Sequence, residues 1–175
     1  NWYNLLLNPS VKFGRSNPDS DPCGYRTVFL FQLAEKHYHQ SGLAEKLLAK
    51  DIQFIRPKEV DLLALLEARA IDCFFIYRSV AVQHQLAFIE LPLEVNLSLP
   101  AYDSLYSLAC ANIAANRPGE TRQVCGEAIV YGLSIPKNAQ NPALAQKFAS
   151  FVLNKDHGLK TMAENGQPPI VPDFC

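Results

Sequence analysis

The alternation of short apolar segments with proline-marked helix starts constrains the fold of this chain most. Asp21-Pro22 combines a favoured N-cap with proline at the first helical position, which predicts a helix to about residue 38. Pro57 opens a leucine-rich stretch that predicts another helix, and the apolar run 73–76 predicts a buried parallel strand. Strands and helices in this order are typical of a doubly wound α/β lobe with a mixed, mostly parallel sheet flanked by helices.

The same signals predict the remaining elements. We expect short strands at 11–13, 52–55 and 87–90, antiparallel strands at 105–113 and 127–135, and helices at 41–49, at 81–84, after Asn141-Pro142 and at 157–166.

Composition excludes several classes of protein. The 175 residues are 49% hydrophobic and 19% charged, which is enough apolar material for a core and excludes a disordered chain. Sixteen basic and 17 acidic residues give a net charge of −1, so a nucleic-acid partner is not expected. No apolar run approaches the roughly 20 residues that span a bilayer. The chain shows no secretion leader, which we expect to lie outside it if one exists.

The five cysteines leave their pairing open. Cys23, Cys73, Cys110, Cys125 and Cys175 show no zinc-binding spacing. Cys110 and Cys125 flank a polar stretch. They either form a disulfide or are two small buried residues.

Two loop-to-helix junctions are the candidate site, around Asp21 and around Glu59. Junctions of this kind gather at the carboxyl ends of strands, where helix N-termini offer unpaired N–H groups to an anion, and Gly24 would let a ligand approach the backbone. The alternative is that Asp21 is only an N-cap and Glu59 only a first-turn acid. A carboxylate repels an ordinary oxyanion by roughly 4 kcal/mol at about 4 Å, so two acids at an anion site require a cationic centre between them.

Two further side chains carry chemistry. Tyr77 follows the buried strand and is expected either to donate its hydroxyl to a ligand or to lie half-buried at the rim. A thiol at a helix start, such as Cys23, is expected to have a lowered pKa. The histidines of that helix, His37 and His39, lie too far along it to act as its base, which argues against a Cys23-dependent enzyme.

Several segments together resemble a known family. NWY, FGRSNPDSDPCGYR, RPKEVDLLALLEARAIDCFFIYRSVAVQH and AIVYGLSIPKNAQNPALAQKFASFVLN are similar to the tungstate/molybdate-binding proteins of ABC transporters, which are type II periplasmic binding proteins. DPCGYR, RPKE and IYRSVAVQH carry the resemblance when they occur in this order. The last segment resembles periplasmic binding proteins in general.

The resemblance implies a site and a function. Asp21, Pro22 and Cys23 would form the first ligand segment, Glu59 the second carboxylate and Tyr77 the hydroxyl donor. Asp21 and Glu59 would bind the tungsten or molybdenum of the oxyanion directly, giving a six-coordinate centre. The protein would be a non-enzymatic solute-binding component that needs no cofactor. It would be periplasmic or extracellular and work with a membrane permease.

The resemblance also implies a division of the chain. Residues 1–126 would be the second lobe of a two-lobe protein whose N-terminal lobe is missing, and 127–175 would be a hinge strand with helices that return to that lobe. The alternatives are a lobe of the same fold for another small anion, and the effector domain of a transcription regulator.

Overall fold

The computed structural model describes residues 1–115 and 117–170, which form two compact units. The first unit contains residues 1–76 and 90–129, and the second contains residues 77–89 and 130–175, of which 171–175 lie outside the described part. The assignment of residues 1–126 to one lobe and 127–175 to a hinge and returning helices stays a prediction.

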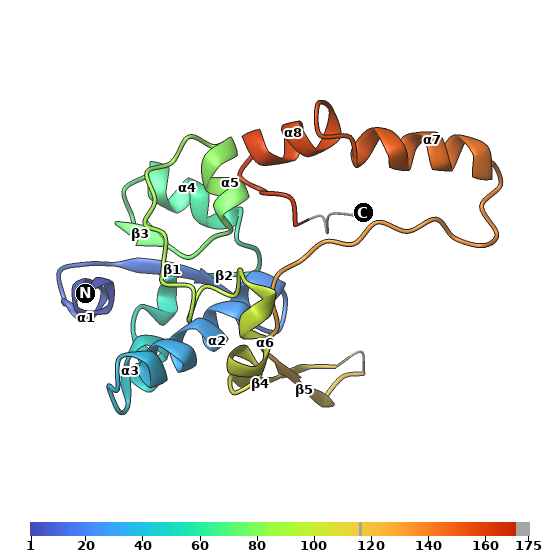
Figure 1. Ribbon diagram of the computed structural model, residues 1–175. Coiled ribbons are helices and arrows are strands. Elements are labelled where there is room, and N and C mark those ends of the chain that lie inside the picture. Colours follow the sequence, from blue (N-terminus) through green and yellow to red (C-terminus); the bar gives the residue numbers. More distant parts are fainter. Residues whose placement is uncertain (116, 171–175) are drawn as a thin grey trace. The chain divides into compact units, whose positions relative to one another are not determined.

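A three-stranded parallel sheet lies at the centre of the first unit, in the order β2-β1-β3 (Figure 1). Its strands are β1 (Phe13–Ser16), β2 (Ile55–Arg56) and β3 (Cys73–Phe74). Arg15 pairs with Ile55, and Phe13 pairs with Cys73. The fold is therefore mixed α/β, with helices flanking a small parallel sheet, as the sequence predicts.

Helices cover both faces of this sheet (Figure 1). Phe13 packs on one face against Phe31 of α2 (Pro22–His37), and the adjacent Gly14 faces Leu62 of α4 (Asp61–Glu67) on the other. The other helices of this unit are α1 (Trp2–Leu7), α3 (Leu43–Ala49), η1 (Ile52–Phe54), η2 (Pro100–Tyr102) and α6 (Asp103–Tyr106). The core includes Phe13, Phe29, Phe31, Leu33, Leu47 and Tyr106, all fully or almost fully buried.

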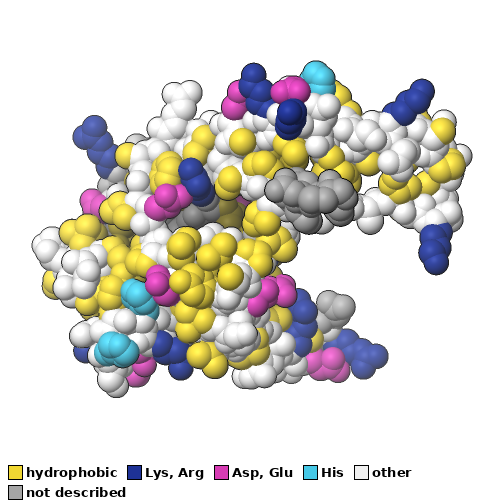
Figure 2. Space-filling model, in the orientation of Figure 1, with side chains coloured by type: hydrophobic (Ala, Val, Ile, Leu, Met, Phe, Trp, Pro, Cys, Tyr) yellow, Lys and Arg dark blue, Asp and Glu magenta, His cyan; other side chains and the backbone are white. Residues whose placement is uncertain are grey.

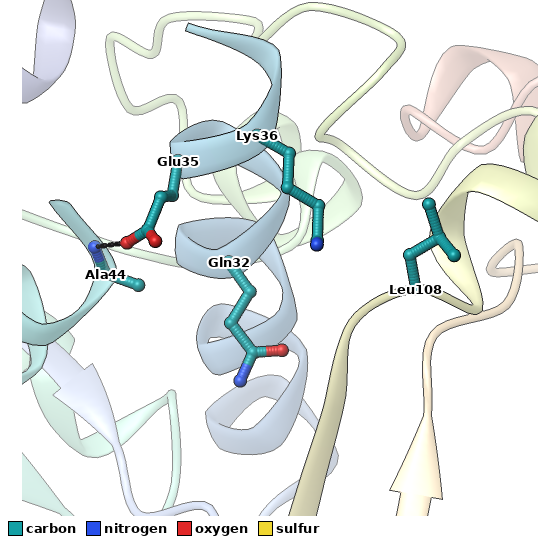
Figure 3. Close-up of a pocket in the computed structure, with 5 residues that line it drawn as sticks. All are labelled: Gln32, Glu35, Lys36, Ala44 and Leu108. Carbon is teal, nitrogen blue, oxygen red and sulfur yellow. Dashed lines mark hydrogen bonds between the residues drawn. The ribbon is translucent and has the colours of Figure 1, made fainter. Parts of the chain in front are cut away.

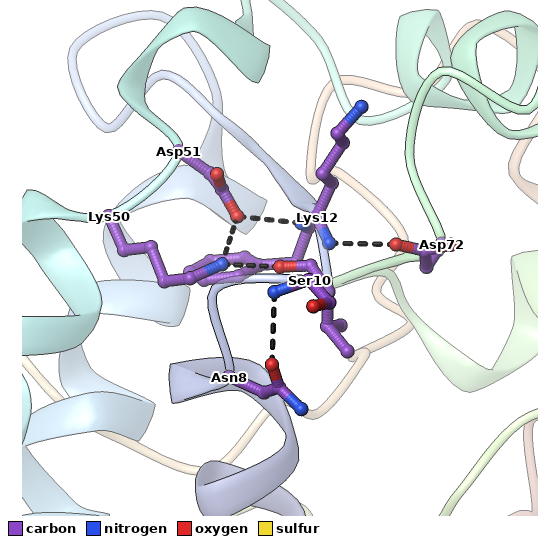
Figure 4. A network of polar contacts seen from close by, with 8 residues as sticks. Asn8, Ser10, Lys12, Lys50, Asp51 and Asp72 are labelled. Atoms are coloured by element: carbon purple, nitrogen blue, oxygen red, sulfur yellow. Dashed lines mark hydrogen bonds and ion pairs between the residues drawn. The ribbon is translucent and has the colours of Figure 1, made fainter.

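A polar network pins the beginning of β1 (Figure 4). The Asp51 carboxylate accepts the N–H of Phe13 at 3.0 Å and the ammonium of Lys50 at 2.6 Å. The Asp72 carboxylate accepts the N–H of Lys12 at 2.7 Å. These bonds lie at the amino end of the strand, so they fix β1 at the end opposite to Asp21.

A disulfide-linked hairpin completes the first unit. β4 (Cys110–Ala114) and β5 (Thr121–Cys125) pair antiparallel, and Cys110 is bonded to Cys125. The amide of Gln32 exchanges two hydrogen bonds of 2.9 Å with the backbone of Cys110, which docks the hairpin on α2. Of the two alternatives left open for these cysteines, the disulfide is the one observed. Cys175 lies outside the described residues.

The second unit is helical. It contains α5 (Arg78–Gln83), α7 (Pro142–Val152) and α8 (Gly158–Glu164). Leu144, Phe148 and Phe151 of α7 are more than half exposed, and apolar side chains are visible over this helix in Figure 2. No helix within the described residues is long and apolar enough to cross a membrane.

Several predicted elements differ from those observed. Residues 87–90 and 127–135 form no strand, and the antiparallel partner of β4 is β5. Residues 52–54 form a 3₁₀ turn that leads into a two-residue strand. The pairing of β4 with β5 depends on contacts between chain segments, which alternation of apolar residues does not reveal.

Candidate functional site

Asp21 is the N-cap of α2 and is almost fully buried, with 7% of its surface exposed. Its Oδ1 accepts the N–H of Cys23 at 3.0 Å, and its backbone carbonyl accepts those of Gly24 and Tyr25 at 2.9 and 3.4 Å. The predicted N-cap is therefore confirmed. These N–H groups were expected to be free for an anion, but in this structure Asp21 itself satisfies them.

The loop before Asp21 is organised by Asn17. Its carbonyl accepts the N–H groups of Ser20 and Asp21, at 3.1 and 3.0 Å, and its own N–H donates to Arg56 of β2 at 2.7 Å. A Cβ on Gly24 would lie 2.5 Å from the carbonyl carbon and oxygen of Asn17. The sequence analysis expected a ligand to use the space beside Gly24, but the chain's own loop fills it.

Glu59 lies in the connection between β2 and α4. Its N–H donates to Oδ2 of Asp21 at 2.7 Å, so the two junctions meet directly. The predicted helix start at Pro57 is wrong, because α4 begins at Asp61. Residues 57–60 form a turn in which the N–H of Lys58 donates to the Asp61 carboxylate at 3.2 Å. Glu59 therefore precedes α4 by two residues and is not a first-turn acid.

The side chains of Asp21 and Glu59 also interact, and this interaction moves their pKa values in opposite directions. Burial acts to raise the pKa of Asp21, but hydrogen bonds with Glu59 and the N–H of Cys23, together with the nearby Ser16 hydroxyl, outweigh it and lower that pKa. The hydrogen bond to Asp21, followed by burial, raises the pKa of Glu59. Asp21 is therefore the more acidic member of the pair, and Glu59 holds its proton to higher pH.

Cys23 differs from its expectation. Burial, followed by the negative charge of Asp21, raises the pKa of its thiol to about 12. Its side chain is 4% exposed, and its sulfur lies 3.7 Å from the carbonyl oxygen of Phe75. The expected lowered pKa is wrong, because burial and the adjacent carboxylates outweigh the favourable effect of the helix start.

The other two predicted site residues lie as follows. Pro22 is exposed at the first position of α2. Tyr77 is half-buried and is the N-cap of α5 in the second compact unit. The structure thus brings together Asp21, Pro22, Cys23 and Glu59, and the role of Tyr77 stays a prediction.

No other feature of the described residues is a stronger candidate site than Asp21 and Glu59. A shallow pocket beside α2 is lined by Gln32, Glu35, Lys36, Ala44 and Leu108 (Figure 3). Two of its polar side chains already have backbone partners, because Gln32 binds Cys110 and Glu35 accepts the N–H of Ala44 at 2.9 Å. Among the described residues, no three His, Cys, Asp or Glu side chains gather as a resident metal site would require.

The fold and the sequence together define the class. Residues 1–166 match the family described as bacterial extracellular solute-binding protein, and the chain belongs to this family. This family is one of solute-binding proteins rather than of enzymes, and its description places them outside the cytoplasm.

Three individual relatives show which proteins this chain is similar to. The chain is 44% identical to a solute-binding protein of Petrotoga mobilis, with 98% of this chain and 54% of the relative covered. It is 37% identical to the molybdate/tungstate-binding protein WtpA of Pyrococcus abyssi (98% and 54% covered) and 38% identical to WtpA of Thermococcus kodakarensis (97% and 53% covered). The chain spans about half the length of these relatives.

Proposed function

We propose that this chain is the oxyanion-binding lobe of a periplasmic or extracellular solute-binding protein that delivers tungstate or molybdate to an ABC transporter permease. One observation carries the proposal, namely that the Asp21 carboxylate accepts the N–H of Glu59 at 2.7 Å, which brings the two acidic side chains close enough to shift each other's pKa. The relatives named for molybdate and tungstate support the ligand class.

The electrostatics of the pair explain why the ligand would contain a metal. Two ionised carboxylates close together repel each other, and the raised pKa of Glu59 is the consequence of Asp21 and burial in the free protein. Protonation of Glu59 would relieve this repulsion. A high-valent metal centre can replace that proton and attract both carboxylates. Tungsten and molybdenum accept additional oxygen ligands, whereas the sulfur of sulfate does not, so the same pair would reject sulfate.

Each residue of the site has a proposed role. Asp21 and Glu59 would bind the metal of the oxyanion. When Asp21 turns to the metal, the N–H groups of Cys23 and Glu59 that it now accepts would become donors for the oxide oxygens. Pro22 has no N–H and fixes the backbone at this point. Tyr77 would donate its hydroxyl to a further oxide. The protein needs no cofactor, because the metal arrives with the ligand.

Calorimetric titration of the whole protein that contains this chain tests the proposal. We expect tungstate and molybdate to bind and sulfate to bind far more weakly. Asp21→Asn and Glu59→Gln should each weaken tungstate binding at least tenfold, or about 1.4 kcal/mol. The amide of Asp21→Asn still accepts the N–H of Cys23, so loss of the helix cap does not explain its effect.

The matched control is Asp61→Asn. Asp61 is exposed and lies two residues from Glu59, and its replacement removes a nearby negative charge without removing a proposed ligand. It should leave tungstate affinity within about twofold of the wild type. Unchanged affinity in both Asp21→Asn and Glu59→Gln would contradict the ligand role of the carboxylates.

A further inference from the structure

The Ser16 hydroxyl is an unused polar group beneath the carboxylate pair. Ser16 is fully buried at the carboxyl end of β1, and its oxygen has no well-formed hydrogen bond within the described part of the chain. A buried hydroxyl without a partner costs free energy, so its presence calls for an explanation.

The sheet places this hydroxyl on the face of β1 that is turned toward the candidate site. Side chains alternate along a strand, so Ser16 shares a face of β1 with Gly14, which lies against Leu62 of α4. Ser16 also pairs in register with Arg56, three residues before Glu59. The hydroxyl is close enough to the Asp21 carboxylate and the Cys23 thiol to favour the ionised form of each, although the pKa of Cys23 is raised by its burial.

We propose that Ser16 is a positioning residue of the site, whose hydroxyl donates to the Asp21 carboxylate when Asp21 gives up its hydrogen bonds with Glu59 to bind the ligand. In the free protein, Asp21 already accepts the N–H groups of Cys23 and Glu59 and interacts with the Glu59 side chain. Ser16 is then a spare donor. In the bound protein it keeps the Asp21 carboxylate oriented from beneath.

This inference rests on the proposed function, and Ser16→Ala separates positioning from a purely structural role. Removal of a buried hydroxyl that lacks a partner should leave the free protein at least as stable as the wild type. The variant should nevertheless bind tungstate about tenfold more weakly, because a hydrogen bond to a charged group is lost in the complex. The measurements are thermal unfolding of the free protein and calorimetric titration with tungstate.

The control is Ser107→Ala, which removes a hydroxyl of the same unit that bonds to the carbonyl of Ser104. It should leave tungstate affinity unchanged. If the wild type binds tungstate and Ser16→Ala binds it equally well, or if Ser16→Ala is clearly less stable than the wild type, the positioning role is wrong. If the wild type does not bind tungstate, the proposed function itself fails.

Discussion

At the scale of single residues, the same side chains serve both the stability of the free protein and the proposed binding of the ligand. Asp21 serves as helix cap, as acceptor for the N–H of Glu59 and as partner of the Glu59 carboxyl group. The interaction between the two side chains favours the protonated form of Glu59, and this form is lost as the pH rises. A residue arrangement that is poor for the stability of the free protein is common at binding sites.

The raised pKa of Glu59 predicts how stability changes with pH. Folding favours its protonated form, so this contribution is present at acid pH and is lost as the pH rises through the pKa of the folded protein. In Glu59→Gln the amide still donates to Asp21 and does not titrate. We therefore expect the variant to be more stable than the wild type at about pH 8 and the difference to shrink toward about pH 4.

Thermal unfolding across this pH range measures the effect. The same variant should bind tungstate weakly, so stability and affinity should change in opposite directions. A Glu59→Gln protein that is less stable than the wild type at the higher pH would contradict the raised pKa of Glu59.

The thiol of Cys23 gives a second prediction at this scale. Its pKa of about 12 and its burial keep it protonated and inaccessible at neutral pH. Iodoacetamide should therefore leave Cys23 unmodified in the folded protein and alkylate it after denaturation, as read by peptide mass spectrometry. Alkylation of folded Cys23 at the rate of the denatured protein would contradict this prediction and support a nucleophilic role for this residue.

At the scale of elements, the loop of residues 17–21 packs closely against the start of α2. Gly24 makes this possible, because any side chain there would meet the backbone of Asn17 and Pro18 at 2.5–2.6 Å. The loop in turn holds Asp21 and contacts β2 through Arg56. The helix start is thus fitted to the loop that precedes it.

Gly24→Ala tests this fit. We expect it to destabilise the protein by about 1–3 kcal/mol, because the backbone of the loop must move to accommodate the added methyl group. Tungstate affinity should fall as well, since Asp21 moves with the loop. The control is Gly132→Ala, where a Cβ would meet nothing within 4 Å. Denaturant unfolding that gives equal stability for the two variants would contradict the close packing.

How far the sequence predicts an element depends on whether its signal is local. The start of α2 is predicted correctly because Asp21 and Pro22 are adjacent and act within one turn. The start of α4 is predicted four residues too early, because the carboxylate of Asp61 binds the N–H of Lys58 and stabilises a turn there. The role of Ser16 has no local signal at all, since it depends on the register of β1 with β2.

At the scale of the whole molecule, the carboxylate pair and Ser16 belong to one compact unit and Tyr77 to the other. The family is identifiable from short motifs in a fixed order, because they carry the residues of the two junctions. Residues 77–89 group with 130–175 through contacts distant in sequence, and the predicted division into residues 1–126 and 127–175 stays a prediction. The chain covers about half of its curated relatives, so its transport role stays a proposal.

X-ray absorption at the tungsten edge of the tungstate-loaded protein tests most directly whether Asp21 and Glu59 bind the metal. Free tungstate is tetrahedral, and two carboxylate ligands should raise the coordination to roughly six oxygens. We predict this expanded shell in the wild type and its partial loss in Glu59→Gln. A bound tungstate that keeps its tetrahedral shell in the wild type would contradict the account.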